Sequence, residues 1–212
     1  MSRVSRFADP GLAAVEVRGV TRGAFLVRST LSAGAVFGAG AVGPFVGRAL
    51  AQSGGGKSAD VDILNFALTL EYLEAAFYER ALKLPLSAEV SGLARGFGRH
   101  EREHVEAIRD TIDQLGGDPV QAPELSFPRT GDRAFLRLAQ TLEETGVSAY
   151  NGAAVGIESA EVLAAAGAIV QVEARHAAAI RLQRGLEPAP RPTDESLKME
   201  QVLKAIDPFV RS

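Results

Sequence analysis

Residues 69–78 read TLEYLEAAFY, and residues 141–150, which follow 72 positions later, read TLEETGVSAY. Both segments begin with Thr-Leu-Glu and end with tyrosine. The same offset relates EREH at residues 101–104 to EARH at residues 173–176. Two spaced motifs that recur at one offset indicate that a single structural unit occurs twice in the chain.

Each copy of this unit predicts a pair of helices. Alanine and leucine dominate both copies and β-branched runs are few, a composition that favours helix. Glycine and proline cluster mainly near the N-terminus and in a few breaks, and Gly116-Gly117 and Gly185 are expected to stop the second helix of each pair. Asp60 is the expected N-cap residue of the first helix. The four predicted helices cover about residues 60–83, 88–115, 132–154 and 159–184.

Residues 116–131 join the two helix pairs. This segment is rich in proline and has no helical period, and at up to about 3.3 Å per residue it is long enough to cross a bundle lengthwise. Two helical hairpins joined by one long crossover form the ferritin-like connectivity. The sequence therefore predicts an all-α, ferritin-like four-helix bundle over residues 60–185. A Pro-rich tail follows at residues 186–212, with one short helix over about residues 195–206 that packs against the outside.

The charges of the chain are unevenly distributed. Residues 1–51 hold six arginines and two acidic side chains, although acidic residues outnumber Lys and Arg in the whole chain by 26 to 23. The remainder is therefore acidic, and we expect no nucleic-acid partner. The chain has no cysteine, which excludes disulfides, zinc–thiolate sites and iron–sulfur clusters.

Residues 1–51 resemble an export signal. A basic stretch precedes a mildly apolar run, and Ala49-Leu50-Ala51 then supplies a small-x-small pattern that predicts cleavage after Ala51. Residues 21–26 resemble a twin-arginine signal, but Gly23 replaces the second arginine, so a Sec signal is the alternative route. We expect residues 52–59 to be a linker and the mature protein to have no transmembrane domain. An uncleaved membrane anchor is the other interpretation, against which Pro44 and the many glycines argue.

Each predicted helix carries one glutamate in the middle of its apolar face, and the second and fourth helices add a histidine one turn later. Four unpaired carboxylates would be costly to bury, and no lysine or arginine shares these faces at the same level. Two divalent ions would balance the charge, and this arrangement is the known pattern of ferritin-like dimetal proteins. The predicted metal ligands are Glu71, Glu101, His104, Glu143, Glu173 and His176.

The alternative to metal binding is a degenerate bundle whose polar core is a protonated network. Two observations favour the metal. Two of only three histidines in the chain have a glutamate three residues before them, and these two motifs are separated by the repeat offset. Such a coincidence is improbable on a merely solvated helix face.

Other residues near the predicted centre have two interpretations each. Tyr78 and Tyr150, two turns beyond Glu71 and Glu143, could hydrogen-bond to ligand carboxylates of the facing helices, or could be ordinary core tyrosines. Glu74 has no counterpart, because position 146 is glycine. It could be a seventh, movable ligand or a solvated side chain, and we favour the solvated state.

His100 and Glu144 lie one position away from the apolar faces, so we expect both at the periphery of the site. Gly146, Gly152 and Gly156 would leave space beside the centre. That space would admit a small oxidant, or would only allow the helices to pack closely.

Residues 64–78 and 142–150 together resemble the ferritin-like domain family that includes the desiccation-related proteins. The resemblance covers about residues 58–185. It implies that the six predicted ligands match the dimetal ligands of the wider group, which also contains bacterioferritins, rubrerythrins and manganese catalases. It implies a fold and a metal site rather than a settled activity.

Three functions are compatible with these features. Oxygen and nitrogen ligands suit iron or manganese, so a redox enzyme could oxidise Fe(II) with O2 or peroxide, or consume peroxide. A non-enzymatic role in the envelope during drying, with structural or no metal, is the main alternative. Iron storage in a cage ranks last, because export and a Pro-rich tail fit it poorly, although the chain could form a smaller homo-oligomer.

Overall fold

The computed structural model describes residues 59–211, and the predicted export signal and nearly all of the linker lie outside this range. The described part is helical, and its one β-bridge, between Leu125 and Val210, is isolated. No helix in it is long and apolar enough to cross a membrane. The prediction of an all-α bundle is confirmed. The α-helices are α3 (Ala59–Ala81), α4 (Ala88–Gln114), α5 (Asp132–Ala153), α6 (Ala160–Gln183) and α7 (Met199–Ile206).

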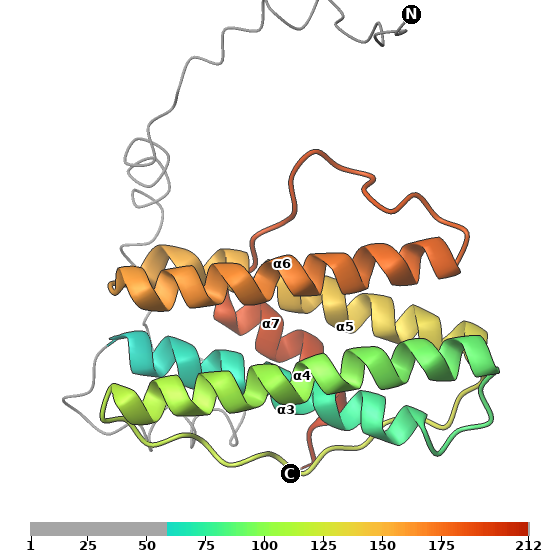
Figure 1. Ribbon diagram of the computed structural model, residues 1–212, viewed down its shortest axis with the longest axis horizontal. Coiled ribbons are helices and arrows are strands. Elements are labelled where there is room, and N and C mark those ends of the chain that lie inside the picture. The colour runs from blue at the N-terminus through green and yellow to red at the C-terminus, as the bar shows by residue number, and fades with distance from the viewer. Residues whose placement is uncertain (1–58, 212) are drawn as a thin grey trace, which may run out of the picture. The chain divides into compact units, whose positions relative to one another are not determined.

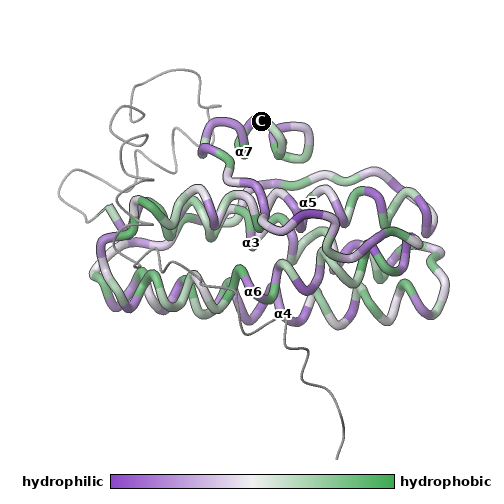
Figure 2. Tube along the Cα trace, turned by 90° about the horizontal axis from the view of Figure 1, so that it is seen from above, coloured by the Kyte–Doolittle hydropathy of each residue, from purple (hydrophilic) through white to green (hydrophobic). Residues whose placement is uncertain are grey.

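The four long helices form two hairpins, α3 with α4 and α5 with α6, which pack on each other as the two layers seen in Figure 1. Helix α7 lies outside this bundle, on the side formed by α3 and α5, and Figure 2 shows α4 and α6 on the opposite side. Apolar residues of α7 join the same core cluster as residues of α3 and α5. The buried contributors from α7 are Val202, Leu203 and Ile206.

The long crossover runs beside α3. Near the start of α3, the Asn65 side chain accepts a 2.8 Å hydrogen bond from the backbone N–H of Val120 and donates one of 3.2 Å to the Asp118 carbonyl. Near the end of α3, the rings of Phe77 and Phe127 pack edge to face with centroids 5.4 Å apart. Side chains of α3 therefore hold the crossover at both ends, which fixes the direction in which α5 begins.

Glycines end the second helix of each hairpin, as expected. Gly116 and Gly185 have φ of 73° and 71°, a left-handed conformation that residues with a Cβ rarely adopt. The tail helix begins at Met199, four residues later than predicted. The backbone N–H of Leu197 donates to the Ser148 carbonyl of α5, so this part of the tail pairs with α5 instead of continuing the helix.

The N-cap prediction for Asp60 is wrong. Asp60 lies inside α3 and is buried, and its carboxylate accepts hydrogen bonds of 2.7 and 2.8 Å from the backbone N–H groups of Glu158 and Ser159. Asp132, its equivalent in the second repeat, accepts a 2.9 Å bond from the N–H of Ser87. Each hairpin thus caps the inter-helix turn of the other, and the repeat extends to both ends of the bundle.

Gly152 does not leave space beside the predicted centre. A Cβ at this position would overlap the carbonyl oxygen of Leu197, because the tail backbone crosses α5 there. Gly156 faces Ile63, whose Cδ1 would be 3.1 Å from an added Cβ. Both glycines therefore serve packing, which favours the second of the two interpretations over room for an oxidant.

We predict that Gly152→Ala destabilises the protein by about 1–3 kcal/mol, because the backbone of the tail must shift to admit the methyl group. The matched control is Gly167→Ala in α6, where an added Cβ meets nothing within 4 Å. The control should gain about 0.5–1 kcal/mol from helix propensity. Urea unfolding followed by circular dichroism measures both, and equal midpoints for the two variants would contradict the packing of the tail.

Candidate metal centre

The six predicted ligands, supplied by α3, α4, α5 and α6, meet in the centre of the bundle. Glu71 is 1% exposed, and Glu101, Glu143 and Glu173 are 0% exposed. The side chains form two groups of four, and in each group the candidate ligand atoms lie within 4.8 Å of one another. The groups are Glu71, Glu101, His104 and Glu173, and Glu101, Glu143, Glu173 and His176.

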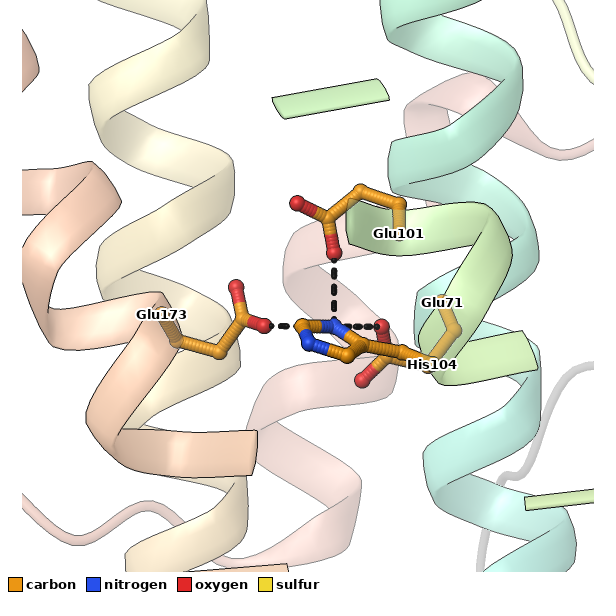
Figure 3. Close-up of side chains that lie close together, drawn as sticks. All are labelled: Glu71, Glu101, His104 and Glu173. Carbon is orange, nitrogen blue, oxygen red and sulfur yellow. Dashed lines mark hydrogen bonds and ion pairs between the residues drawn. The ribbon is translucent and has the colours of Figure 1, made fainter. Parts of the chain in front are cut away.

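In the first group, three carboxylates surround one imidazole nitrogen, as Figure 3 shows. His104 Nδ1 lies 3.0 Å from Glu101 Oε2, 3.0 Å from Glu173 Oε1 and 3.2 Å from Glu71 Oε2. The glutamates come from three different helices, so the arrangement exists only in the folded bundle.

The second group repeats this geometry around His176. Its Nδ1 lies 3.0 Å from Glu101 Oε1, 3.3 Å from Glu143 Oε2 and 3.7 Å from Glu173 Oε2. Glu101 and Glu173 therefore direct one oxygen to each group. Glu71 belongs to the first group alone and Glu143 to the second alone, a division of roles that sequence spacing does not reveal.

Hydrogen bonds within the protein do not satisfy this cluster. One imidazole nitrogen carries at most one proton, yet each Nδ1 faces three carboxylate oxygens. Buried polar atoms without a partner cost about 1–3 kcal/mol each, so their concentration at one point requires an explanation. The oxygen and nitrogen donors fit divalent metal ions. Several buried atoms of the cluster make no hydrogen bond of good geometry, although ligand atoms of the other residues lie nearby: Glu101 Oε1, Glu143 Oε2, both carboxylate oxygens of Glu173 and His176 Nδ1.

Burial controls the protonation of the glutamates. It raises the pKa of Glu71 to about 8 and the pKa of Glu143 well above its usual value. Burial would also raise the pKa of Glu173, but its close contacts with the imidazoles of His104 and His176 outweigh burial and hold that pKa at about 2. In the metal-free protein the carboxyl groups thus differ in charge, although they lie close together.

The two imidazoles are cationic in the metal-free protein. Burial alone would lower their pKa values, but close contacts with the surrounding carboxylates outweigh burial. The pKa of His104 is raised to about 12 and that of His176 to about 11. Two imidazolium groups therefore place positive charge among the carboxylates of the metal-free protein.

Each tyrosine of the repeated motif binds a glutamate of the other hairpin. Tyr150 in α5 donates a 2.5 Å hydrogen bond to Glu71 Oε1, and Tyr78 in α3 donates to Glu143 Oε1. Burial raises the pKa of both tyrosines well above its usual value, so both remain protonated donors. These bonds leave the other oxygen of Glu71 and Glu143 directed toward the imidazoles.

The expectation that Glu74 is solvated is wrong, because its side chain is 2% exposed. Its carboxylate occupies the space beside Gly146, where an added Cβ would lie 3.3 Å from Glu74 Oε1. Ile206 of α7 lines the same small cavity. Burial, followed by the charges of Glu173 and the other nearby carboxylates, raises the pKa of Glu74 well above its usual value. Gly146 thus leaves space that a side chain of this protein fills.

His100 and Glu144 have different positions. Glu144 lies at the edge of the bundle as expected, where it pairs with Arg181 at 2.5 Å. His100 was expected there too, but its Nδ1 lies 2.9 Å from Nε2 of His176. One sequence feature does indicate that His100 lies near the site: it precedes His104 by one turn on the same helix face. The partner on α6 was not evident from sequence, because it depends on the distance between helices.

Comparisons with known proteins agree with this architecture. The profile of the ferritin-like domain family matches residues 59–186, and a search of curated proteins finds no match. A crystal structure of a conserved hypothetical protein from Mycobacterium tuberculosis has a similar fold, with a TM-score of 0.55 and 19% identity over 66% of this chain and 97% of that chain. That similarity concerns the fold alone. Because the family profile matches more than half of the sequence, the chain belongs to the ferritin-like domain family.

Proposed function

We propose that this is an exported ferritin-like protein that binds a di-iron or di-manganese centre and uses it in redox chemistry, as a ferroxidase or a peroxide-consuming enzyme of oxidative stress. The observation that carries the proposal is the buried cluster of four glutamates and two histidines, in which several polar atoms lack partners. Buried carboxylates are costly unless they are paired or bind metal ions, and the oxygen and nitrogen donors converge on two points.

The donor set divides naturally between two ions. Glu101 and Glu173 would each bind both ions, Glu71 and His104 would complete one set, and the remaining glutamate and histidine the other. Iron or manganese bound there would supply electrons to O2 or peroxide. The residues of the chain bind the ions and orient the ligand side chains. The tyrosines hold the outer oxygens of Glu71 and its counterpart, and the apolar residues of the four helices exclude water.

The alternative is a non-enzymatic protein of the desiccated envelope with structural metal or none. One observation favours it. The imidazolium groups of His104 and His176 already balance carboxylate charge, so the metal-free bundle can remain folded. Metal content and oxidant consumption separate the two proposals.

Export remains part of the proposal and rests on residues 1–51. The basic stretch, the apolar run and Ala49-Leu50-Ala51 support it. Mass spectrometry of the protein from its native host would give the N-terminus. A start at Gln52 in the exported fraction supports cleavage, and a full-length chain in the cell interior opposes it.

We predict that the metal-free protein binds two Mn(II) or Fe(II) ions per chain, and that Glu143→Gln weakens binding by about 10-fold or more. The same variant should cost the metal-free protein little stability, because burial raises the pKa of Glu143 well above its usual value and so disfavours its charged form. Glu79→Gln, which alters an exposed glutamate of α3, is the control and should bind metal normally. Calorimetric titration and unfolding curves measure both. Wild-type protein that takes up no ion would contradict the centre.

We predict that metal affinity rises between pH 6 and 8 and that binding releases protons. The ions must displace protons from Glu71, with a pKa of about 8, and from His104 and His176, with pKa values of about 12 and 11. Higher pH therefore favours the metal-bound form. Titrations in buffers of different ionisation enthalpy count the released protons. Affinity that falls with pH, or binding without proton release, would oppose this ligand set.

We predict that anaerobically loaded protein consumes O2 or peroxide, and that His104→Ala and His176→Ala each abolish most of this activity. An oxygen electrode and a peroxide assay detect it. Glu79→Gln again serves as the control. Loaded wild-type protein that consumes neither oxidant would favour the non-enzymatic alternative.

A further inference from the structure

The two metal-ligating imidazoles have different surroundings. His176 packs against the face of Phe97 with ring centroids 4.0 Å apart and 21° between the planes, and its Nε2 lies 2.9 Å from Nδ1 of His100. Both neighbours belong to α4. At the repeat offset, the equivalent positions on α6 are occupied by Ile169 and Val172, and neither side chain can accept a hydrogen bond.

The contact between His100 and His176 has the geometry of a hydrogen bond rather than of ring stacking. The rings are nearly parallel, at 6°, with centroids 5.2 Å apart. Atoms of stacked rings stay about 3.5–4.0 Å apart, whereas these nitrogens are 2.9 Å apart. The two imidazoles therefore lie edge to edge in nearly one plane, in which their N–H bonds and lone pairs point.

This geometry bears on which nitrogen of His176 carries a proton. Nδ1 faces the carboxylates, so it is the atom that would bind a metal ion, and the ring proton must then be on Nε2. An acceptor 2.9 Å from Nε2 stabilises that tautomer and fixes the orientation of the ring. The other ring nitrogen of His100, Nε2, lies 3.4 Å from the guanidinium of Arg99, which is long for a hydrogen bond. Among the described residues, no other charged group is seen to bond to this nitrogen. Arg99 is exposed and also lies 3.8 Å from Glu103, so it can leave when that nitrogen carries a proton.

We propose that His100 is a positioning residue for the metal ion at His176, holding its imidazole by accepting a hydrogen bond from Nε2–H. The proposal rests on the proposed dinuclear centre and deepens it. Because Val172 provides no such acceptor on the opposite side, the two metal positions are unequal, and the position at His176 is the one that depends on His100.

The test is a titration of the metal-free full chain with Mn(II), followed by electron paramagnetic resonance of the free ion. His100→Phe keeps a flat ring but removes the acceptor. It should weaken the binding of one Mn(II) ion by about 10–100-fold and change the affinity for the other by no more than a few-fold. His100→Asn places an amide oxygen near the original Nδ1 and should restore most of the affinity.

The control is Val172→Ala at the equivalent position of the other hairpin, a substitution that removes no hydrogen-bond acceptor. It should leave both affinities near those of the wild type. Wild-type affinity for both ions in His100→Phe overturns the proposal, as does an equal loss in Val172→Ala, because the effect would then not come from a lost acceptor. Wild-type protein without bound Mn(II) overturns the dinuclear centre itself, which distinguishes the two failures.

A spectroscopic readout separates hydrogen bonding from a structural effect. In the Co(II)-loaded protein, the N–H proton of a bound imidazole resonates far outside the ordinary proton range. One such signal should persist in deuterated water for wild type and His100→Asn, because Nε2–H is held by its acceptor, and should exchange rapidly in His100→Phe. Equal exchange rates in all three proteins would overturn the assignment of His100.

Discussion

The structure depends on one constraint, the burial of four carboxylates at the centre of an otherwise apolar bundle. A buried charge without compensation costs several kcal/mol, so each of these glutamates requires a partner within a few ångströms. The partners are two imidazoles on α4 and α6 and two tyrosines on α3 and α5. The helices must therefore approach in one register, because a shift of one turn would separate Glu71 and Glu143 from their tyrosines and imidazoles on the other helices.

Repetition of one helical hairpin meets this constraint twice. Glu101 and Glu173 connect the two halves of the centre, since each directs one oxygen to either histidine. At the ends of the bundle, Asp60 and Asp132 cap the turns of the opposite hairpins. The central cluster and the end caps thus impose the same pairing of the halves. The two hairpins are not equivalent at one position, because Glu74 of the first faces Gly146 of the second, which has no carboxylate.

Helical periodicity and the repeat were sufficient to predict the bundle, the crossover and the convergence of the central glutamates and histidines, because these follow from which face of each helix is apolar. The burial of Glu74 could not be predicted in this way. It involves α7, because Ile206 of this tail helix lines the cavity that Glu74 occupies, and the sequence does not tell where the tail helix docks. The contact of His100 with His176 depends on the separation of α4 and α6, which spacing within one helix does not determine. The role of Asp60 was missed because an aspartate that caps a distant turn has the same local sequence as one that caps its own helix.

The most direct measurement is anomalous X-ray diffraction at the iron and manganese edges, from crystals of the protein purified from its native host. The account predicts two anomalous peaks in each chain, both between Glu101 and Glu173, with His104 beside one and His176 beside the other. A map without peaks at this point, with the six side chains instead paired among themselves or directed outward, would contradict it.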